Sequence, residues 1–224
     1  KSHSVNSRYH ATGLVDGINV GLTGTWFQDR LNHEGIYVDS WLTYSWFDNK
    51  VKGETLRTEK YHSKGLSASV ETGYTAKLSD FKTVAGTDVS WYLQPQAQVI
   101  WSGVKTDTFH EANSTEVKSK GRNNIQTRLG ARTFVNISSQ AYFNGTAGTQ
   151  LFFEGNWIHN TKSPGVEMNG TALEQKGVRN IGEVKLGLNG KLNKNLQLWT
   201  NATAQAGSNH YRDLTGMIGL KYSF

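Results

Sequence analysis

The feature that most constrains this chain is a two-residue alternation of apolar and polar side chains, repeated in nine long segments. Such an alternation is typical of a β-strand with one apolar face, because successive side chains of a strand point to opposite sides. We therefore expect an all-β, antiparallel fold. The nine predicted strands are 14–28, 35–47, 65–78, 89–103, 125–137, 149–158, 181–192, 194–206 and 215–224.

The length of these segments narrows the fold further. Strands of globular proteins average about five or six residues, whereas a tilted strand needs about 9–11 residues to cross the hydrocarbon of a membrane. Segments such as 35–47 and 89–103 satisfy the second requirement. They favour an up-and-down transmembrane β-barrel. A soluble β-sandwich, whose strands also alternate, is the alternative.

Charged residues fall almost entirely on the polar side of the alternation. A lipid-facing surface would require this, because an arginine or lysine that faces the bilayer midplane costs roughly 2–4 kcal/mol. We expect these charged side chains to face the barrel lumen. There they could line the path of whatever occupies the lumen or brace the wall electrostatically, and the sequence favours neither role. The predicted lumen-facing charged residues are Asp39, Glu71, Arg128, Arg132, Glu154, Glu183 and Lys185.

Tryptophans gather near the ends of the predicted strands. Amphipathic rings at both rims of a barrel are typical of the membrane–water interface, although Trp also has a general preference for strands. Their concentration at strand ends predicts an aromatic girdle. Its predicted members are Trp26, Trp46, Trp91 and Trp101.

Short and long connections alternate along the chain. The joins near 29–34, 78–88, 137–148 and 193 are the shorter set, although 137–148 is longer than a turn needs. The other set is 48–64, 104–124, 161–180 and 207–214, of which the first three are long and charged. Bacterial barrels have short periplasmic turns and longer extracellular loops. The last strand, 215–224, is then expected to run toward the periplasm.

Residues for cofactor or metal chemistry are sparse. The chain has no cysteine, which excludes disulfides and thiolate metal sites. Its seven histidines form no H-x-H or H-E-x-x-H pair, and no nucleophile elbow or phosphate-binding glycine loop is present. We expect no catalytic, cofactor or metal site. The alternative is an outer-membrane enzyme with a site at the extracellular rim, for which the candidates are His62, His110, Glu54, Glu59, Asp107 and Glu111.

The net charge of +6 does not indicate a nucleic-acid partner, because lysines and arginines are scattered and form no basic stripe. No apolar run approaches the roughly 18 residues of a transmembrane helix. No signal peptide is visible at Lys1, so we expect a mature or excised segment.

Several blocks resemble the translocator barrel of type V autotransporters, in particular the diffuse-adherence adhesin and antigen-43 subgroup. The resemblance covers nearly the whole chain, in order and spacing. Its blocks are "GTWF" (24–27), "YVDSWLTYSWFDN" (37–49), "KGLSASVETGY" (64–74), "QPQAQVIWSGVKTD" (94–107), "NIQTRLGARTF" (124–134), "NWIHNT" (156–161), "GVRNIGEVKLGL" (177–188) and the terminal "GLKYSF".

The resemblance implies a twelve-stranded outer-membrane barrel, threaded by an α-helix that continues into a secreted passenger. It implies assembly by the BAM complex with periplasmic chaperones, and contact with outer-membrane lipid and lipopolysaccharide. The terminal strand resembles the β-signal, with Gly219, Tyr222 and Phe224 in its marked positions. The implied function is to anchor the passenger, an adhesin, and export it to the cell surface. A general porin is the alternative within the barrel class.

Nine strands are an odd number, whereas the family barrel has twelve. Residues 1–224 are therefore expected to be a translocator barrel that lacks the linker helix and the first three strands. Strand 14–28 would then leave a bare edge, which is costly in lipid. We expect either further strands outside this sequence or another protein's strand to cover that edge. Direct pairing of strand 14–28 with strand 215–224 would contradict this expectation.

Overall fold

The computed structural model describes residues 2–6, 11–52, 58–84, 86–106, 108–110, 114–138, 148–174, 176, 178–191 and 195–223. Nine long strands run through these residues and correspond one to one with the nine predicted strands. They are β2 (Ala11–Phe27), β3 (Gly35–Lys52), β4 (Glu59–Lys82), β5 (Asp88–Ser102), β9 (Asn124–Ser138), β10 (Gly148–Asn160), β13 (Asn180–Lys191), β14 (Leu196–Gly207) and β15 (Arg212–Tyr222).

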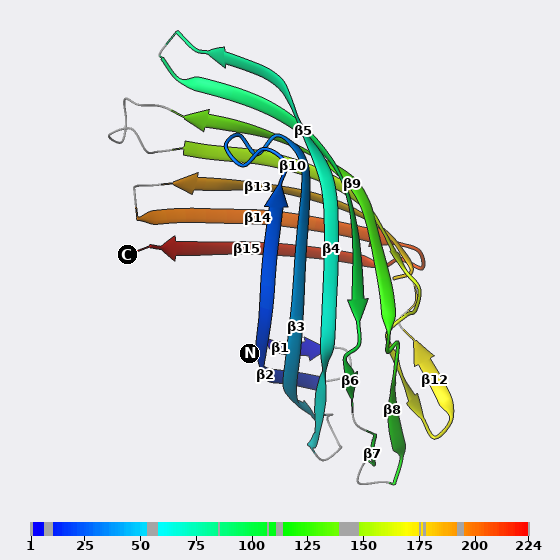
Figure 1. Ribbon diagram of the computed structural model, residues 1–224. Coiled ribbons are helices and arrows are strands. Elements are labelled where there is room, and N and C mark those ends of the chain that lie inside the picture. Colours follow the sequence, from blue (N-terminus) through cyan, green and yellow to red (C-terminus); the bar gives the residue numbers. More distant parts are fainter. Residues whose placement is uncertain are drawn as a thin grey trace.

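The long strands form one antiparallel sheet in chain order. Its order is β1-β2-β3-β4-β5-β9-β10-β13-β14-β15, where β1 is a short strand, Ser2–Asn6. Figure 1 shows that this sheet is strongly twisted and curled, so that it has a concave and a convex face. The predicted all-β, antiparallel, up-and-down architecture is confirmed. Among the described residues, no helix is long and apolar enough to cross a membrane.

Two of the strands extend well beyond the predicted boundaries. β3 continues to Lys52 instead of residue 47, and β4 begins at Glu59 instead of residue 65. In these extensions the ladder continues while the apolar alternation stops: Lys50, for example, lies opposite Lys60. A pattern of hydrophobicity therefore finds the apolar part of a strand and misses a polar extension of the same ladder.

A β-bulge interrupts the register between β4 and β5. The pairing shifts between Lys77 and Ser79, so Ser79 lies opposite Trp91 and Phe81 lies opposite Val89. The extra residue reverses which parity of β4 faces outward, as a bulge does. The alternation predicted for 65–78 therefore ends at this bulge, and the strand continues to Lys82 with the opposite parity.

Short strands lie within the two longest connections. β6 (Lys105–Thr106) pairs with β4 and extends the main sheet. A separate four-stranded sheet has the order β12-β11-β8-β7. Its members are β7 (Phe109–His110), β8 (Glu116–Lys120), β11 (Gly165–Met168) and β12 (Thr171–Glu174). These connections are therefore ordered into a small sheet beyond the main wall, at the end that Figure 1 shows lowest and to the right.

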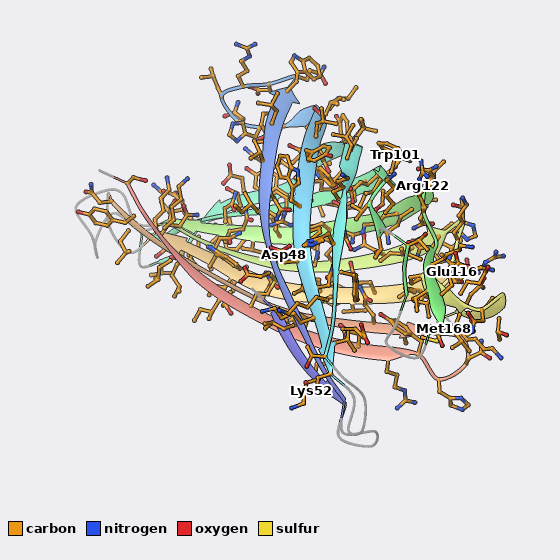
Figure 2. The ribbon with its side chains drawn as sticks, turned by 90° about the horizontal axis from the view of Figure 1, so that it is seen from below. Asp48, Lys52, Trp101, Glu116, Arg122 and Met168 are labelled. Carbon is orange, nitrogen blue, oxygen red and sulfur yellow. The ribbon has the colours of Figure 1, made fainter. Side chains whose placement is uncertain are left out.

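The two faces of the main sheet differ in burial. Every buried residue of the long strands except Gly190 lies on the polar side of the alternation, for example Ser69 at 3% exposed and Thr75 at 5%. Apolar residues on the other side are exposed, for example Leu22 at 78%. The polar face is therefore the concave one, and it is buried because the sheet curls around it (Figure 2).

Within the described residues, β15 does not pair with β2, so the sheet is open. Direct pairing of the first long strand with the last would have contradicted the expectation of an open barrel, and it does not occur among these residues. The bare edge of the first long strand is partly covered, which the sequence did not predict: β1 pairs with Ala11–Val15 of β2. The remainder of that edge, from Asp16 to Phe27, pairs only with β3.

Candidate functional site

The seven charged residues that were predicted to face the lumen all lie on the concave face, and four of them converge. Arg128 comes from β9, Glu154 from β10, and Glu183 and Lys185 from β13. Together with Asn156 of β10 they form what we call the concave cluster. Three neighbouring strands supply these residues because alternate positions of each strand point to the same side.

Glu183 is the centre of the concave cluster and is 4% exposed. Its carboxylate accepts hydrogen bonds from the side-chain amides of Asn156 at 3.0 Å and Gln205 at 2.6 Å. The Arg128 guanidinium lies 3.7 Å away, and the Lys185 ammonium lies 4.0 Å away. A buried carboxylate with two cations and two amide donors is well compensated.

Glu154 is the second buried carboxylate, at 6% exposed. Lys185 Nζ lies 3.7 Å from it, and the Asn156 amide donates to it at 2.7 Å. Asn156 thus bridges the two carboxylates, while Arg128 and Lys185 balance their charge. This arrangement ties β9, β10 and β13 together.

A glycine makes room for the bridging asparagine. Gly130 of β9 lies opposite Asn156, and a Cβ at Gly130 would lie 2.0 Å from the Asn156 Oδ1 atom. Because that space is empty, Asn156 can also accept a hydrogen bond at 3.3 Å from Gln96, which belongs to β5, the strand beyond β9. With Gln205 of β14, the polar network therefore spans five strands: β5, β9, β10, β13 and β14.

Arg132 lies opposite Glu154 but is held differently. Its guanidinium donates to the Gln150 Oε1 atom at 2.7 Å and lies over the rings of Phe152, at 4.3 Å, and Phe134, at 5.4 Å. Aromatic faces attract such a cation electrostatically. Arg132 therefore stiffens the wall next to the concave cluster.

Asp39 and Glu71, the remaining two predicted charges, lie directly opposite each other on β3 and β4. Glu71 accepts a 2.8 Å hydrogen bond from the Tyr37 hydroxyl, and Asp39 accepts one from the Thr25 hydroxyl. Hydroxyl donors rather than cations satisfy them. The sequence reasoning missed Tyr37 and the amides of the network, although their polar-side positions were the signal that could have found them.

The four predicted girdle tryptophans lie on the convex face and are 36–50% exposed. Trp91 and Trp101 lie near opposite ends of β5, and the ten residue steps from one to the other span about 25 Å across a tilted wall, the height of a lipid-facing band. Trp46 is not at a strand end, because β3 continues six residues beyond it. The girdle itself stays a prediction that this placement fits.

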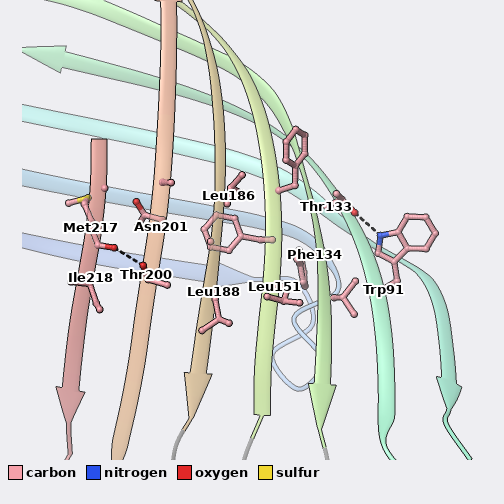
Figure 3. Close-up of a pocket in the computed structure, with 16 residues that line it drawn as sticks. Trp91, Thr133, Phe134, Leu151, Leu186, Leu188, Thr200, Asn201, Met217 and Ile218 are labelled. Carbon is pink, nitrogen blue, oxygen red and sulfur yellow. Dashed lines mark hydrogen bonds between the residues drawn. The ribbon is translucent and has the colours of Figure 1, made fainter. Parts of the chain in front are cut away.

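The convex face that extends from Trp91 across β9, β10, β13, β14 and β15 is mostly apolar and is hollowed. A hollow of about 840 Å³ is lined mostly by convex side chains, including Leu151, Leu186 and Ile218 (Figure 3). At its border the Trp91 indole nitrogen donates to the Thr133 hydroxyl at 2.6 Å. Even the polar hydrogen of this exposed ring is therefore satisfied within the protein.

Two of the three predicted β-signal residues lie in β15. Tyr222 is on the convex face opposite Leu196, and Gly219 is on the concave face opposite Trp199. Phe224 lies outside the described residues. A Cβ at Gly219 would lie 2.4 Å from two carbons of the Trp199 ring, so the glycine provides the space in which this indole lies.

We expect Gly219→Ala to lower the free energy of unfolding of the barrel by about 1–3 kcal/mol, because the added methyl group overpacks the Trp199 indole. Unfolding in detergent, followed by heat-dependent gel migration, measures this loss. Gly216→Ala is the matched control, since a Cβ there meets nothing within 4 Å. Trp199→Leu should restore part of the loss in the double variant. Equal effects at Gly216 and Gly219 would contradict this explanation.

Of the candidates for a rim-site enzyme, the described residues place only the side chains of His62 and Glu59, which point to opposite faces of β4. His62 forms a 2.6 Å pair with Asp48, and both side chains are about 70% exposed. Glu54, Asp107, Glu111 and the side chain of His110 lie outside the residues that can be described. The described part of the chain contains no group of three or more His, Cys, Asp or Glu residues that could hold a metal ion.

Comparisons with known proteins agree with this geometry. The chain matches the family described as "Autotransporter beta-domain" over residues 1–203. It is 37% identical over its full length to the autotransporter adhesin AIDA-I of Escherichia coli, and 45% identical over 99% of its length to the uncharacterized protein YuaQ of E. coli K12. The chain spans only 16–17% of these two relatives.

Two solved structures resemble the fold. The transport unit of AIDA-I superposes with a TM-score of 0.87 and 36% identity, covering 97% of this chain and 69% of that one. The beta domain of the Bordetella autotransporter BrkA gives a TM-score of 0.61 at 21% identity, covering 95% and 75%, which supports the fold alone.

Proposed function

Because the chain belongs to the autotransporter beta-domain family, whose homologues are outer-membrane proteins of Gram-negative bacteria, we propose that it anchors and exports a passenger carried by the same polypeptide. The observation that carries the proposal is the contrast between the two faces of one curled sheet. The convex face is apolar and suits lipid, whereas the concave face is polar and internally paired. A polypeptide that passes along this concave wall meets seven charged side chains that are each already held by an ion pair or a hydrogen bond within the sheet.

Site-specific cross-linking in the full-length protein tests this route. The chain has no cysteine, so single cysteines are unique probes. Thr203→Cys faces the concave side and Ala202→Cys, its neighbour on β14, faces the convex side. During export, a cysteine in the passenger segment should form a disulfide with position 203 and not with position 202. Equal cross-linking at both positions, or none at position 203, would overturn the proposal.

We further propose that additional strands close the barrel. The support is the open sheet, in which β15 and residues 16–27 of β2 each pair on one side only, together with the match to 69% of the AIDA-I transport unit. An uncovered edge in lipid would leave several unsatisfied backbone groups. In the full-length protein, the amides of β15 should exchange slowly with deuterium, and fast exchange would contradict closure.

For assembly, we propose that the C-terminal strand is read by the BAM complex and periplasmic chaperones. Tyr222 supports this idea, since it is 59% exposed on the lipid-facing side of the edge strand. Its ring is therefore available before the barrel closes.

Phe224→Ala is expected to reduce outer-membrane insertion sharply, because it removes the terminal aromatic residue of the proposed signal. The measurement is the amount of heat-modifiable protein in outer-membrane fractions and of degradation products in the periplasm. Ser223→Ala serves as the control at the neighbouring position. Normal surface levels of the Phe224 variant would refute the assignment.

The passenger is proposed to be an adhesin, because AIDA-I is an adhesin by name and matches this chain over its whole length. We propose no catalytic role, cofactor or nucleic-acid partner for residues 1–224. The exposed contact of His62 with Asp48 is then a surface polar pair, which contributes little to stability.

A further inference from the structure

Lysines gather on the convex face where β3, β4 and β6 extend past the apolar band. Lys50 lies directly opposite Lys60, and Lys64 lies directly opposite Lys105. Like charges directly across a ladder destabilise a sheet, and here this occurs once in the β3–β4 ladder and once in the β4–β6 ladder, four residues further along β4. We call Lys50, Lys52, Lys60, Lys64 and Lys105 the lysine patch.

The lysine patch is exposed and its charge is not balanced within the described part of the chain. All five side chains are exposed, and none has an ion-pair partner among the described residues. The carboxylates on the same side are Asp48, which pairs with His62, and Asp16, which lies opposite Asp48. Five ammonium groups thus face two carboxylates, which leaves a local excess of positive charge.

The position of the lysine patch relative to the apolar wall is the second observation. Lys64 lies opposite Trp46, and Trp46 lies opposite Ile18, which is 68% exposed. The patch therefore begins where the apolar convex face ends. Figure 2 shows Lys52 at the far end of β3, and Asp48 closer to the middle of the sheet.

Two hollows connect the charges with the apolar surface. One, of about 540 Å³, is lined by Ile18, Trp46, His62 and Lys64 among others. The second, of about 240 Å³, includes Leu14, Lys50 and Lys52. The first hollow offers one ammonium group, with the His62-paired Asp48 also in its lining, and the second offers two. In both, the ammonium groups lie next to apolar side chains, which suits an amphiphile with an anionic head.

We propose that the lysine patch binds the phosphates of lipid A, the phosphorylated glycolipid of the outer leaflet, while its acyl chains lie along Ile18 and the apolar residues beyond it on β2 and β3. Two features favour lipid A as the ligand. The lysines complement the charge of its phosphates, and the adjoining apolar face can contact its acyl chains. Phosphate binding also offsets the repulsion between the opposed lysines. The proposal rests on the outer-membrane location and is independent of passenger export.

The test uses the purified full-length protein in a non-ionic detergent, with bis-phosphorylated lipid A as the probe. The variant Lys60→Gln/Lys64→Gln is compared with Lys191→Gln/Lys221→Gln, which removes two lysines at the opposite rim. At about 1 kcal/mol per lysine near an anionic lipid surface, the patch variant should bind about thirty-fold more weakly. The control variant should bind like the wild type.

A second measurement separates binding from folding. Without lipid A, the patch variant should be at least as resistant to thermal unfolding as the wild type, because the opposed lysines no longer repel. With lipid A, only the wild type and the control should gain resistance. Equal affinity of both variants, equal binding of dephosphorylated lipid A, or equal stabilisation by inorganic phosphate alone would each overturn the proposal.

Discussion

Leu186→Arg is expected to prevent stable insertion of the barrel into the outer membrane. Leu186 is 55% exposed on the convex face, in register with Phe153 and Ala202 of the neighbouring strands. A guanidinium that faces lipid near the bilayer midplane costs about 2–4 kcal/mol. Outer-membrane fractions should therefore contain little heat-modifiable protein, and the variant should be degraded in the periplasm.

Asn189→Arg on the same strand is the matched control. Asn189 faces the concave side, where it donates a 3.4 Å hydrogen bond to Gln150, and an arginine there can reach water or the polar network. We expect this variant to insert at near wild-type levels. An equal loss of insertion in the two arginine variants would contradict the assignment of Leu186 to the lipid-facing side and Asn189 to the concave side.

The sequence predicted the long strands and their faces because both follow from one local rule. Period-2 alternation needs no knowledge of neighbouring strands, so the apolar side of β13, with Leu186 and Leu188, could be assigned from residues a few positions apart. The same rule placed all seven charged residues on the concave face. Strand pairing then followed from the short joins of an up-and-down sheet.

What the sequence could not predict depends on contacts between distant segments. β1 and the strands of the small sheet are only two to five residues long, too short to leave a periodic pattern in the sequence. The bulge near Leu78 is defined by its pairing with β5. The polar extensions of β3 and β4 likewise appear only in the register of Lys50 with Lys60.

The convergence of the concave cluster was also beyond sequence reasoning. Arg128 and Glu183 are 55 positions apart, and their proximity requires β9, β10 and β13 to be adjacent and in one register. The cluster further depends on Asn156, an uncharged residue, and on the missing side chain of Gly130. Neither residue type indicates a site until the neighbouring strands are known.

Glu183→Leu is expected to lower the free energy of unfolding by up to about 3 kcal/mol, the lower end of the range for breaking a buried ion pair, because the concave face retains some access to water. The substitution leaves Arg128 without its carboxylate partner and removes the acceptor of Asn156 and Gln205. Glu183→Gln should lose only about 1 kcal/mol, since an amide oxygen can still accept. Glu174→Leu, at an exposed position of β12, is the control.

The double variant Arg128→Met/Glu183→Leu decides what the buried charges do. If they brace the wall, the double variant should lose less free energy of unfolding than the two single variants lose together. The reason is that neither partner of the pair is left unpaired inside the barrel. Passenger export should then recover together with stability. If they instead line the path of the passenger, the double variant should be as stable as the wild type or nearly so, yet export more slowly. Additive losses of stability would refute the bracing role, because residues that share an ion pair must be coupled.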